Sequence, residues 1–177
     1  GYALDSLTYP VTVTDRTVTR VHTTSVSDKA KMNSLGLLLQ KKDAQTHEAA
    51  PQGAATLGDA HFRINYYDVP QGTAESIGNR EPRASWLVRT DDTGSFLLEN
   101  ADSFFTHTDT DGATTSLPYK ISGPDFFKLS NGRLAMPLGT YTIQEVKAPA
   151  GYLLDETVHI RHISDADSDE EFVETFE

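Results

Sequence analysis

The residues with the clearest chemical potential lie between Leu138 and Asp155, where a carboxylate falls among apolar side chains. Tyr141, Ile143 and Glu145 share one face of a predicted strand, because side chains alternate between the two faces of a sheet. Glu145 therefore points toward the expected core, where a carboxylate has to be paired, hydrogen-bonded or protonated. In the alternative interpretation the strand frays at Val146 and Glu145 reaches water.

The second group with chemical potential is an amine. Residues 36–43 read GLLLQKKD, so Leu37, Leu39 and Lys41 fall on one face of a predicted strand and Lys42 falls on the other. A lysine usually lies at the surface, with its aliphatic stem covering apolar neighbours. The alternation alone therefore leaves open whether Lys41 is buried or exposed.

Other catalytic and metal-binding patterns are weak or missing. The chain has no cysteine, which excludes thiol catalysis, zinc–thiolate sites and disulfides. Residues 165–171 resemble a calcium loop, but Glu170 stands where a glycine is needed and Phe176 where a bidentate glutamate is needed. His159 and His162 lie on opposite faces of a strand and cannot chelate one metal ion. No nucleophile elbow or phosphate loop is present. We therefore predict no cofactor, no metal and no enzymatic turnover.

Length and composition favour a β-rich chain of one domain or one and a half. The 177 residues are 37% hydrophobic and carry a net charge of −11, with a pI near 4.9. Such a charge disfavours nucleic acid and anionic membrane surfaces as partners, and no segment is long and apolar enough to insert into a membrane. Short β-rich segments bounded by Gly, Pro, Asn and Asp predict an all-β, immunoglobulin-like sandwich.

The elements that must position Lys41 and Glu145 can be placed along the chain. The predicted strands are 36–43, 57–68, 84–91, 95–98, 135–147, 157–163 and 172–176. Segments 84–91 and 95–98 are expected to pair as a hairpin around Gly94. The stretches 69–83 and 99–134 are expected to be long loops. Trp86, the only tryptophan, is expected in the core.

One stretch of the chain resembles a known family. Residues 139–145, GTYTIQE, followed by 148–152, APAGY, resemble the E-box of Cna B-type, prealbumin-like domains, which recur as stalk modules in pilins and adhesins of Gram-positive bacteria. The resemblance implies a prealbumin-like β-sandwich, here with long loop insertions. It also implies that Glu145 assists an isopeptide bond between a lysine of the first strand and an Asn or Asp of the last. By position, that lysine is Lys41, two residues before Asp43.

The acceptor of this bond is the missing part of the pattern. No Asn follows Phe172 in the sequence, so the acceptor for Lys41 is expected beyond Glu177. Asp28 occupies the equivalent place in the N-terminal segment and resembles the acceptor for the lysine of a preceding repeat. Asp28 would meet Lys41 only if this segment docks in place of a missing strand.

The N-terminal segment indicates a repeat. Residues 1–5, GYALD, are similar to residues 151–155, GYLLD, and a β-rich segment follows each of them. We interpret residues 1–31 as the closing strands of a preceding repeat, and 36–177 as a domain that lacks its last strand; coincidence is the alternative. Residues 8–28 are expected to pair with a sheet edge of this domain, or of a neighbouring molecule by strand exchange.

These features lead to three functional hypotheses. The first is a structural stalk domain of a wall-anchored, extracellular adhesin or pilin of a Gram-positive bacterium, with adjacent repeats of the same chain as partners. The second is a module that uses 69–83 and 99–134 to recognise a host protein or glycan, which an exposed aromatic patch including Trp86, Phe126 or Phe127 would favour. The third is a transthyretin-like accessory domain of a secreted enzyme.

Overall fold

Strands make up nearly all of the regular structure in the computed structural model, which describes residues 32–33, 37–98, 104–108, 110–128, 132, 134–164 and 172–176. The largest sheet has five strands in the order β12-β11-β3-β4-β8, and all neighbours in it are antiparallel. Its members are β3 (His61–Tyr67), β4 (Ala84–Arg89), β8 (Tyr119–Ser122), β11 (Gly139–Lys147) and β12 (Val158–Ile163).

A three-stranded sheet in the order β13-β2-β5 supplies the lysine. Its members are β2 (Leu37–Lys41), β5 (Ser95–Leu97) and β13 (Phe172–Phe176). β5 is antiparallel to β2, whereas β13 runs parallel to it with Phe176 opposite Lys41. β13 therefore lies beside β2, the strand that carries Lys41.

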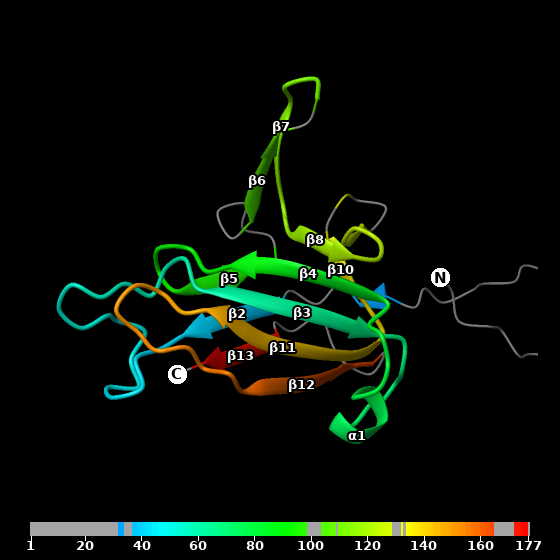
Figure 1. Ribbon diagram of the computed structural model, residues 1–177, viewed down its shortest axis with the longest axis horizontal. Coiled ribbons are helices and arrows are strands. Elements are labelled where there is room, and N and C mark those ends of the chain that lie inside the picture. Colours follow the sequence, from blue (N-terminus) through cyan, green and yellow to red (C-terminus); the bar gives the residue numbers. More distant parts are fainter. Residues whose placement is uncertain are drawn as a thin grey trace, which may run out of the picture.

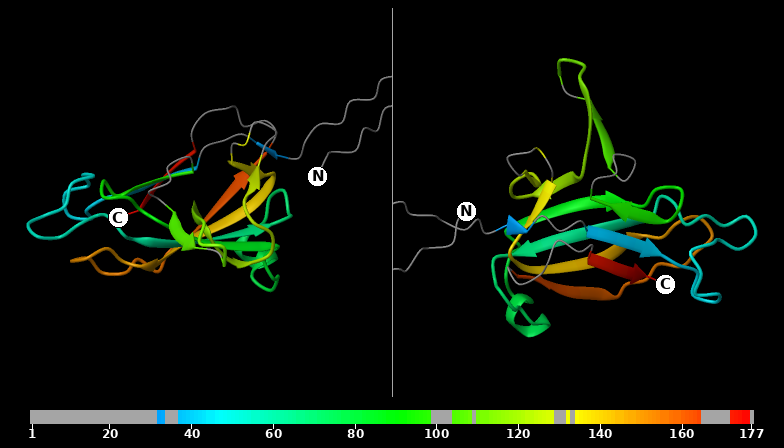
Figure 2. Two further views of the ribbon diagram at one scale, coloured as in Figure 1. Left: turned by 90° about the horizontal axis from the view of Figure 1, so that it is seen from above. Right: turned by 180° about the vertical axis from the view of Figure 1, so that it is seen from behind.

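Two smaller sheets complete the described structure. The first has the order β1-β10-β9 and consists of β1 (Met32–Asn33), β10 (Leu134–Pro137) and β9 (Phe127–Lys128). The second is a hairpin of β6 (Phe105–Thr108) and β7 (Thr114–Leu117), which projects away from the other sheets (Figures 1 and 2). Both figures also show β1 at one end of the sandwich and the C-terminal end of β13 at the other.

The core lies between the sheets and explains why the alternating segments are strands. Phe62, Ile64 and Tyr66 are buried, as the alternation of β3 predicts, and the residues between them are more exposed. Trp86 is 1% exposed, its ring packs on Phe126 at a centroid distance of 4.4 Å, and its indole N–H donates to Pro124 O at 3.0 Å. Each large side chain buried in this way contributes about 1.5–3 kcal/mol. The predictions of an all-β sandwich and of a core position for Trp86 are confirmed.

The strand that carries Glu145 is central to the sandwich. β11 pairs with β3 on one side and with β12 on the other. It begins at Gly139, whose φ of +150° suits glycine and where a Cβ atom would lie 2.6 Å from Tyr67 O. Between Glu145 and Lys147 the pairing with β3 shifts register, which is the geometry of a β-bulge. The strand therefore continues past Val146 with a bulge and does not fray there, and Glu145 stays buried.

Two expectations about connections are wrong. Segments 84–91 and 95–98 do not pair as the strands of a hairpin: the Gly94 N to Asp91 O and Asp91 N to Ser95 O hydrogen bonds close the turn between them, but β4 and β5 belong to different sheets. β4 is already paired on both edges by β3 and β8, so the chain crosses to the other sheet and β5 pairs with β2. The two stretches expected to be long loops are also not entirely loop: 69–83 contains the single-turn helix α1 (Ala74–Ile77), and 99–134 contains β6, β7, β8 and β9.

Local side-chain chemistry accounts for α1. Thr73 accepts a hydrogen bond from Ser76 N, and the Ser76 hydroxyl accepts one from Thr73 N, which is a capping box with serine in the third helical position. Ile77 is buried and holds the turn on the domain. No helix among the described residues is long and apolar enough to cross a membrane. Asp28, the segment 8–28 and the acidic turn 165–171 lie outside the described residues.

Candidate functional site

The amine of Lys41 and the carboxylate of Glu145 meet inside the sandwich. Lys41 ends β2, Glu145 comes from β11 in the opposite sheet, and each residue is 1% exposed. Lys41 Nζ lies 3.2 Å from Glu145 Oε1. The two strands therefore bring together a pair of oppositely charged groups that are far apart in the sequence and have been removed from water, an arrangement that is costly unless each group is paired.

The second oxygen of Glu145 is also occupied. Asp155 N, from the loop between β11 and β12, donates to Glu145 Oε2 at 2.8 Å. With one oxygen held by this amide, the other faces the lysine. The β-bulge after Glu145 lies next to this contact, and bulges commonly re-aim a side chain at such places.

Asp155 contributes a further negative charge. Hydrogen bonds from Thr157 hold the pKa of the Asp155 carboxyl below its usual value, and the positive charge of Lys41 lowers that pKa further. Thr157 N donates to Asp155 Oδ1 at 2.9 Å. Asp155 therefore stays ionised at neutral pH within the electrostatic field of Lys41.

Asp43, two residues after Lys41, is a buried carboxylate with several donors. Gln45 N and Thr46 N donate to Oδ1 at 2.9 and 3.0 Å, Gln52 Nε2 lies 2.9 and 3.0 Å from the two oxygens, and the Tyr152 hydroxyl donates to Oδ2 at 2.9 Å. Asp43 is 3% exposed. These hydrogen bonds, led by the one from Thr46, lower the pKa of Asp43 to about 2.

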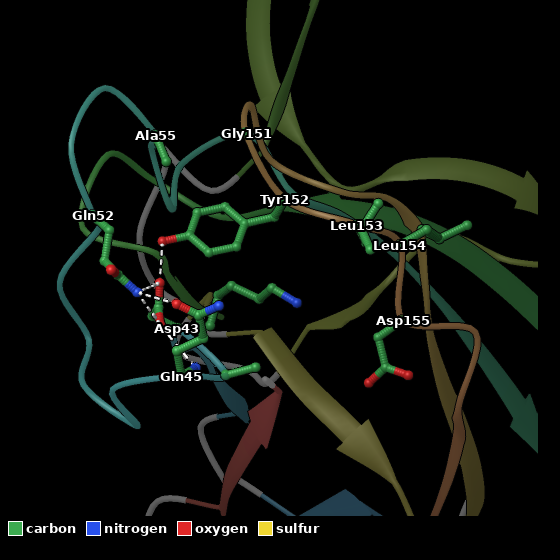
Figure 3. A pocket seen from close by; sticks show the side chains of 11 residues that line it. Asp43, Gln45, Gln52, Ala55, Gly151, Tyr152, Leu153, Leu154 and Asp155 are labelled. Atoms are coloured by element: carbon green, nitrogen blue, oxygen red, sulfur yellow. Dashed lines mark hydrogen bonds between the residues drawn. The ribbon is translucent and has the colours of Figure 1, made fainter.

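A cavity of about 590 Å³ opens beside Lys41, between the loop that follows β2 and the loop that follows β11. In Figure 3, Tyr152 reaches across to Asp43, while Asp155 lies on the opposite side of the cavity. Leu153 and Leu154 are exposed at its rim. The cavity gives a small group access to the region of the lysine.

The remaining sequence-predicted residues do not join this site. Lys42 is half-buried and follows the end of β2, whereas Lys41 faces Glu145. His162 Nδ1 lies 3.1 Å from Thr140 Oγ1, at the other end of β11. Within the residues that the structure describes, no group of three or more His, Cys, Asp and Glu side chains is arranged to hold a metal ion.

Sequence reasoning gave no role to Asp43, Tyr152 and Asp155. A usable signal existed for Asp43, because an Asp that is followed by polar residues often accepts from the backbone two and three positions later, and it does so here. Asp155 has the same kind of signal, because its carboxylate accepts from Thr157 N two positions later, whereas Tyr152 has none. The partner of the Tyr152 hydroxyl, Asp43, is distant in sequence. The partner of the Asp155 amide, Glu145, lies next to a bulge that the alternation does not reveal.

A family model described as the SpaA prealbumin-like fold domain matches residues 37–175. The chain belongs to this family. The match covers the strands that carry Lys41 and Glu145, and it agrees with the resemblance given by the E-box of the domain.

Two solved structures are similar to this SpaA-family domain. The group B streptococcus pilus 2b backbone protein matches with 15% identity and a TM-score of 0.35, over 86% of this chain and 42% of that chain. The Bacillus anthracis TIE protein matches with 13% identity and a TM-score of 0.22, over 84% of this chain and 34% of that one. The chain thus spans less than half the length of either protein. No curated protein matches it.

Proposed function

We propose that this domain is a load-bearing stalk module of a pilin or adhesin on the surface of a Gram-positive bacterium, stabilised by an isopeptide bond from Lys41. The observation that carries the proposal is the buried Lys41–Glu145 pair, with 3.2 Å between Nζ and Oε1. Membership of the SpaA prealbumin-like family supports it. The domain acts on itself once and turns over no substrate.

The chemistry starts with a proton transfer between the paired groups. Across the 3.2 Å contact, Glu145 takes a proton from Lys41, which leaves a neutral amine facing a carboxylic acid. The amine nitrogen attacks the side-chain carbonyl carbon of an Asn, or of a protonated Asp, while Glu145 donates a hydrogen bond to the carbonyl oxygen. A new C–N bond forms, the old C–N or C–O bond breaks, and ammonia or water leaves with the transferred proton.

The acceptor is the open part of this proposal. Asp28 is one candidate, and an Asn or Asp that continues from β13 is the other. The second fits the parallel pairing of β13 with β2, because a strand extended past Phe176 runs beside the end of β2, where Lys41 lies. Closing a long loop in this way contributes on the order of 4 kcal/mol, by analogy with a disulfide.

The topology suits a module that carries load. β1 lies at one end of the sandwich and the C-terminal end of β13 at the other (Figure 1). Tension applied at Leu37 and at Phe176 pulls two parallel paired strands in opposite directions, which loads their hydrogen bonds together in shear. A covalent tie at Lys41 would prevent these strands from sliding apart.

Intact-mass measurement tests the bond. If Asp28 is the acceptor, we expect residues 1–177 to have a mass lower than the sequence mass by one water. If the acceptor follows Glu177, we expect a chain extended past Glu177 to lose one ammonia or one water. In both cases the cross-linked peptide should contain Lys41. Lys41→Arg and Glu145→Ala are expected to restore the full mass, whereas the neighbouring change Lys42→Arg is expected to leave the bond intact. A mass equal to the sequence mass would exclude an internal bond in this chain, and a cross-link from any other lysine would contradict the assignment of Lys41.

The ligand-binding alternative gains no support from the aromatic residues that suggested it. Trp86 and Phe126 are 1% and 8% exposed, and Phe127 is half-buried against the core. These three residues therefore form no exposed patch.

A further inference from the structure

A single side-chain hydrogen bond joins the two loops that lie beside the Lys41–Glu145 pair. The Tyr152 hydroxyl donates to Asp43 Oδ2 at 2.9 Å, across the mouth of the cavity (Figure 3). Asp43 follows Lys41 by two residues, and Tyr152 precedes Asp155 by three. The bond thus links the strand end that bears the amine to the loop that contacts the carboxylate.

The position of that loop decides how Glu145 is oriented. Asp155 N donates to Glu145 Oε2 at 2.8 Å, which leaves Oε1 facing Lys41 Nζ at 3.2 Å. If the loop moved away, Glu145 Oε2 would lose its donor and the carboxylate could rotate about its last side-chain bond. Such terminal torsions have broad energy minima, so the hydrogen bond at Oε2 acts together with the contact to Lys41 at Oε1 to fix this angle.

The loop is also attached on both sides of this stretch, since Glu156 O accepts from Gln144 Nε2 at 3.1 Å after Asp155. Ala150 O accepts a backbone hydrogen bond from Thr56 N at 3.0 Å, before Tyr152 in the chain. After Tyr152, Leu153 is 93% exposed and Leu154 is 45% exposed. Between the Ala150 contact and Asp155, Tyr152 is therefore the side chain that ties the loop to the domain.

Both partners of this bond are in the correct protonation state over a wide pH range. Hydrogen bonds keep the pKa of Asp43 at about 2, so its carboxylate accepts at neutral pH. Burial and the bond to Asp43 raise the pKa of Tyr152, so its hydroxyl remains a donor.

We infer that Tyr152 and Asp43 form a latch that positions Glu145 for its reaction with Lys41. Tyr152 is a positioning residue and acts through the Asp155 amide. The inference rests on the proposed isopeptide chemistry for its functional meaning, but the latch itself can be observed without that chemistry.

Hydrogen exchange of the Asp155 amide tests the latch. Tyr152→Phe removes only the hydroxyl and keeps the ring, so the cavity wall should stay in place. Losing one net hydrogen bond is expected to speed exchange of the Asp155 amide roughly tenfold in NMR. The amide of Ile143, in the centre of β11, is expected to exchange at its wild-type rate. The matched control is Tyr119→Phe, since Tyr119 is 58% exposed on β8 and is expected to leave both rates unchanged.

Two results would overturn the latch. One is an unchanged Asp155 exchange rate in Tyr152→Phe; the other is an increase shared equally by Ile143, because that would indicate global destabilisation. The rate at which newly synthesised protein, extended past Glu177 to include the expected acceptor, loses ammonia or water provides the functional readout and should fall in Tyr152→Phe but not in Tyr119→Phe. If exchange changes as expected but no variant ever loses mass, the latch stands and the isopeptide proposal fails.

Discussion

The Lys41–Glu145 site and the β6–β7 hairpin show two ways in which this domain handles polar residues. At the site, the polar groups are buried and paired with one another. Asp43 accepts from four residues, and Glu145 contacts both Lys41 and the Asp155 amide. In the hairpin, the Thr108 and Thr114 hydroxyls lie 3.3 Å apart at an exposed position.

The hairpin is attached mainly through its base. Phe105 packs edge-on against His61 with ring centroids 5.1 Å apart, and the Arg89 guanidinium lies 5.6 Å from the centre of the Phe105 ring. A two-stranded ribbon has little stability of its own in water. Removing one hydrogen-bond or ion-pair partner should therefore lower the stability strongly where the polar groups are buried. Where they face water, the effect should be small and local.

The largest effect is expected from leaving one member of the buried pair alone. Glu145→Gln keeps the shape of the side chain but leaves the Lys41 charge without its counter-ion, which is expected to cost about 3–5 kcal/mol. The free energy of unfolding in urea measures this loss. Mass spectrometry should first establish whether Lys41 is free in both proteins, because a covalent tie would change the reference state.

The double variant Lys41→Met with Glu145→Leu provides the matched control. It removes both charges and fills the space with apolar atoms, so we expect it to be close to the wild type or more stable. If Glu145→Gln unfolds at the same urea concentration as the wild type, the Lys41–Glu145 pair is not shielded from water.

A second effect concerns the stability of the fold at low pH. The folded-state pKa of Asp43 is lowered to about 2, below its ordinary value of 3.8, so its hydrogen bonds stabilise the fold above that ordinary value. This contribution is expected to disappear as the pH falls through about 2. In Asp43→Asn, the dependence of unfolding free energy on pH between about 4 and 2 should be shallower. Equal slopes for the variant and the wild type would contradict the role given to this carboxylate.

The strands of the site were predictable because their side chains alternate. In β3 the alternation placed Phe62 and Ile64 in the core, and in β11 it placed Glu145 beside Tyr141 and Ile143. Alternation is a local property with a period of two, so it can be read from the sequence without knowing the fold. It also depends little on which other strand becomes the neighbour.

Pairing and loop contacts were not predictable in the same way. Which strand β5 joins is decided by β8, which occupies the free edge of β4 from a distant part of the chain. The bond from Tyr152 to Asp43 likewise joins loops far apart in sequence. Such contacts depend on the assembled sandwich, and only the carboxylates of Asp43 and Asp155, with backbone donors two or three residues away, left a local signal.

A smaller and more local effect is expected at the base of the hairpin. Phe105→Ala removes the edge contact with His61 and the contact with Arg89, each of which is expected to contribute about 0.5–1.5 kcal/mol. Because the hairpin can open without the sandwich, the amides of β6 and β7 should exchange faster while those of β11 keep their rates. A matching rise in β11 would show that the hairpin is part of the cooperative core.

The smallest effect is expected farther out on the same hairpin. Thr108→Ala removes one of two exposed hydroxyls that lie 3.3 Å apart, and water can replace the lost partner of Thr114. Exposed changes of this kind usually alter stability by less than about 0.5 kcal/mol. Urea unfolding of Thr108→Ala should therefore coincide with that of the wild type, within error. A loss near that of Glu145→Gln would mean that the hairpin is held by more than its base, and that the distinction drawn between the two regions is wrong.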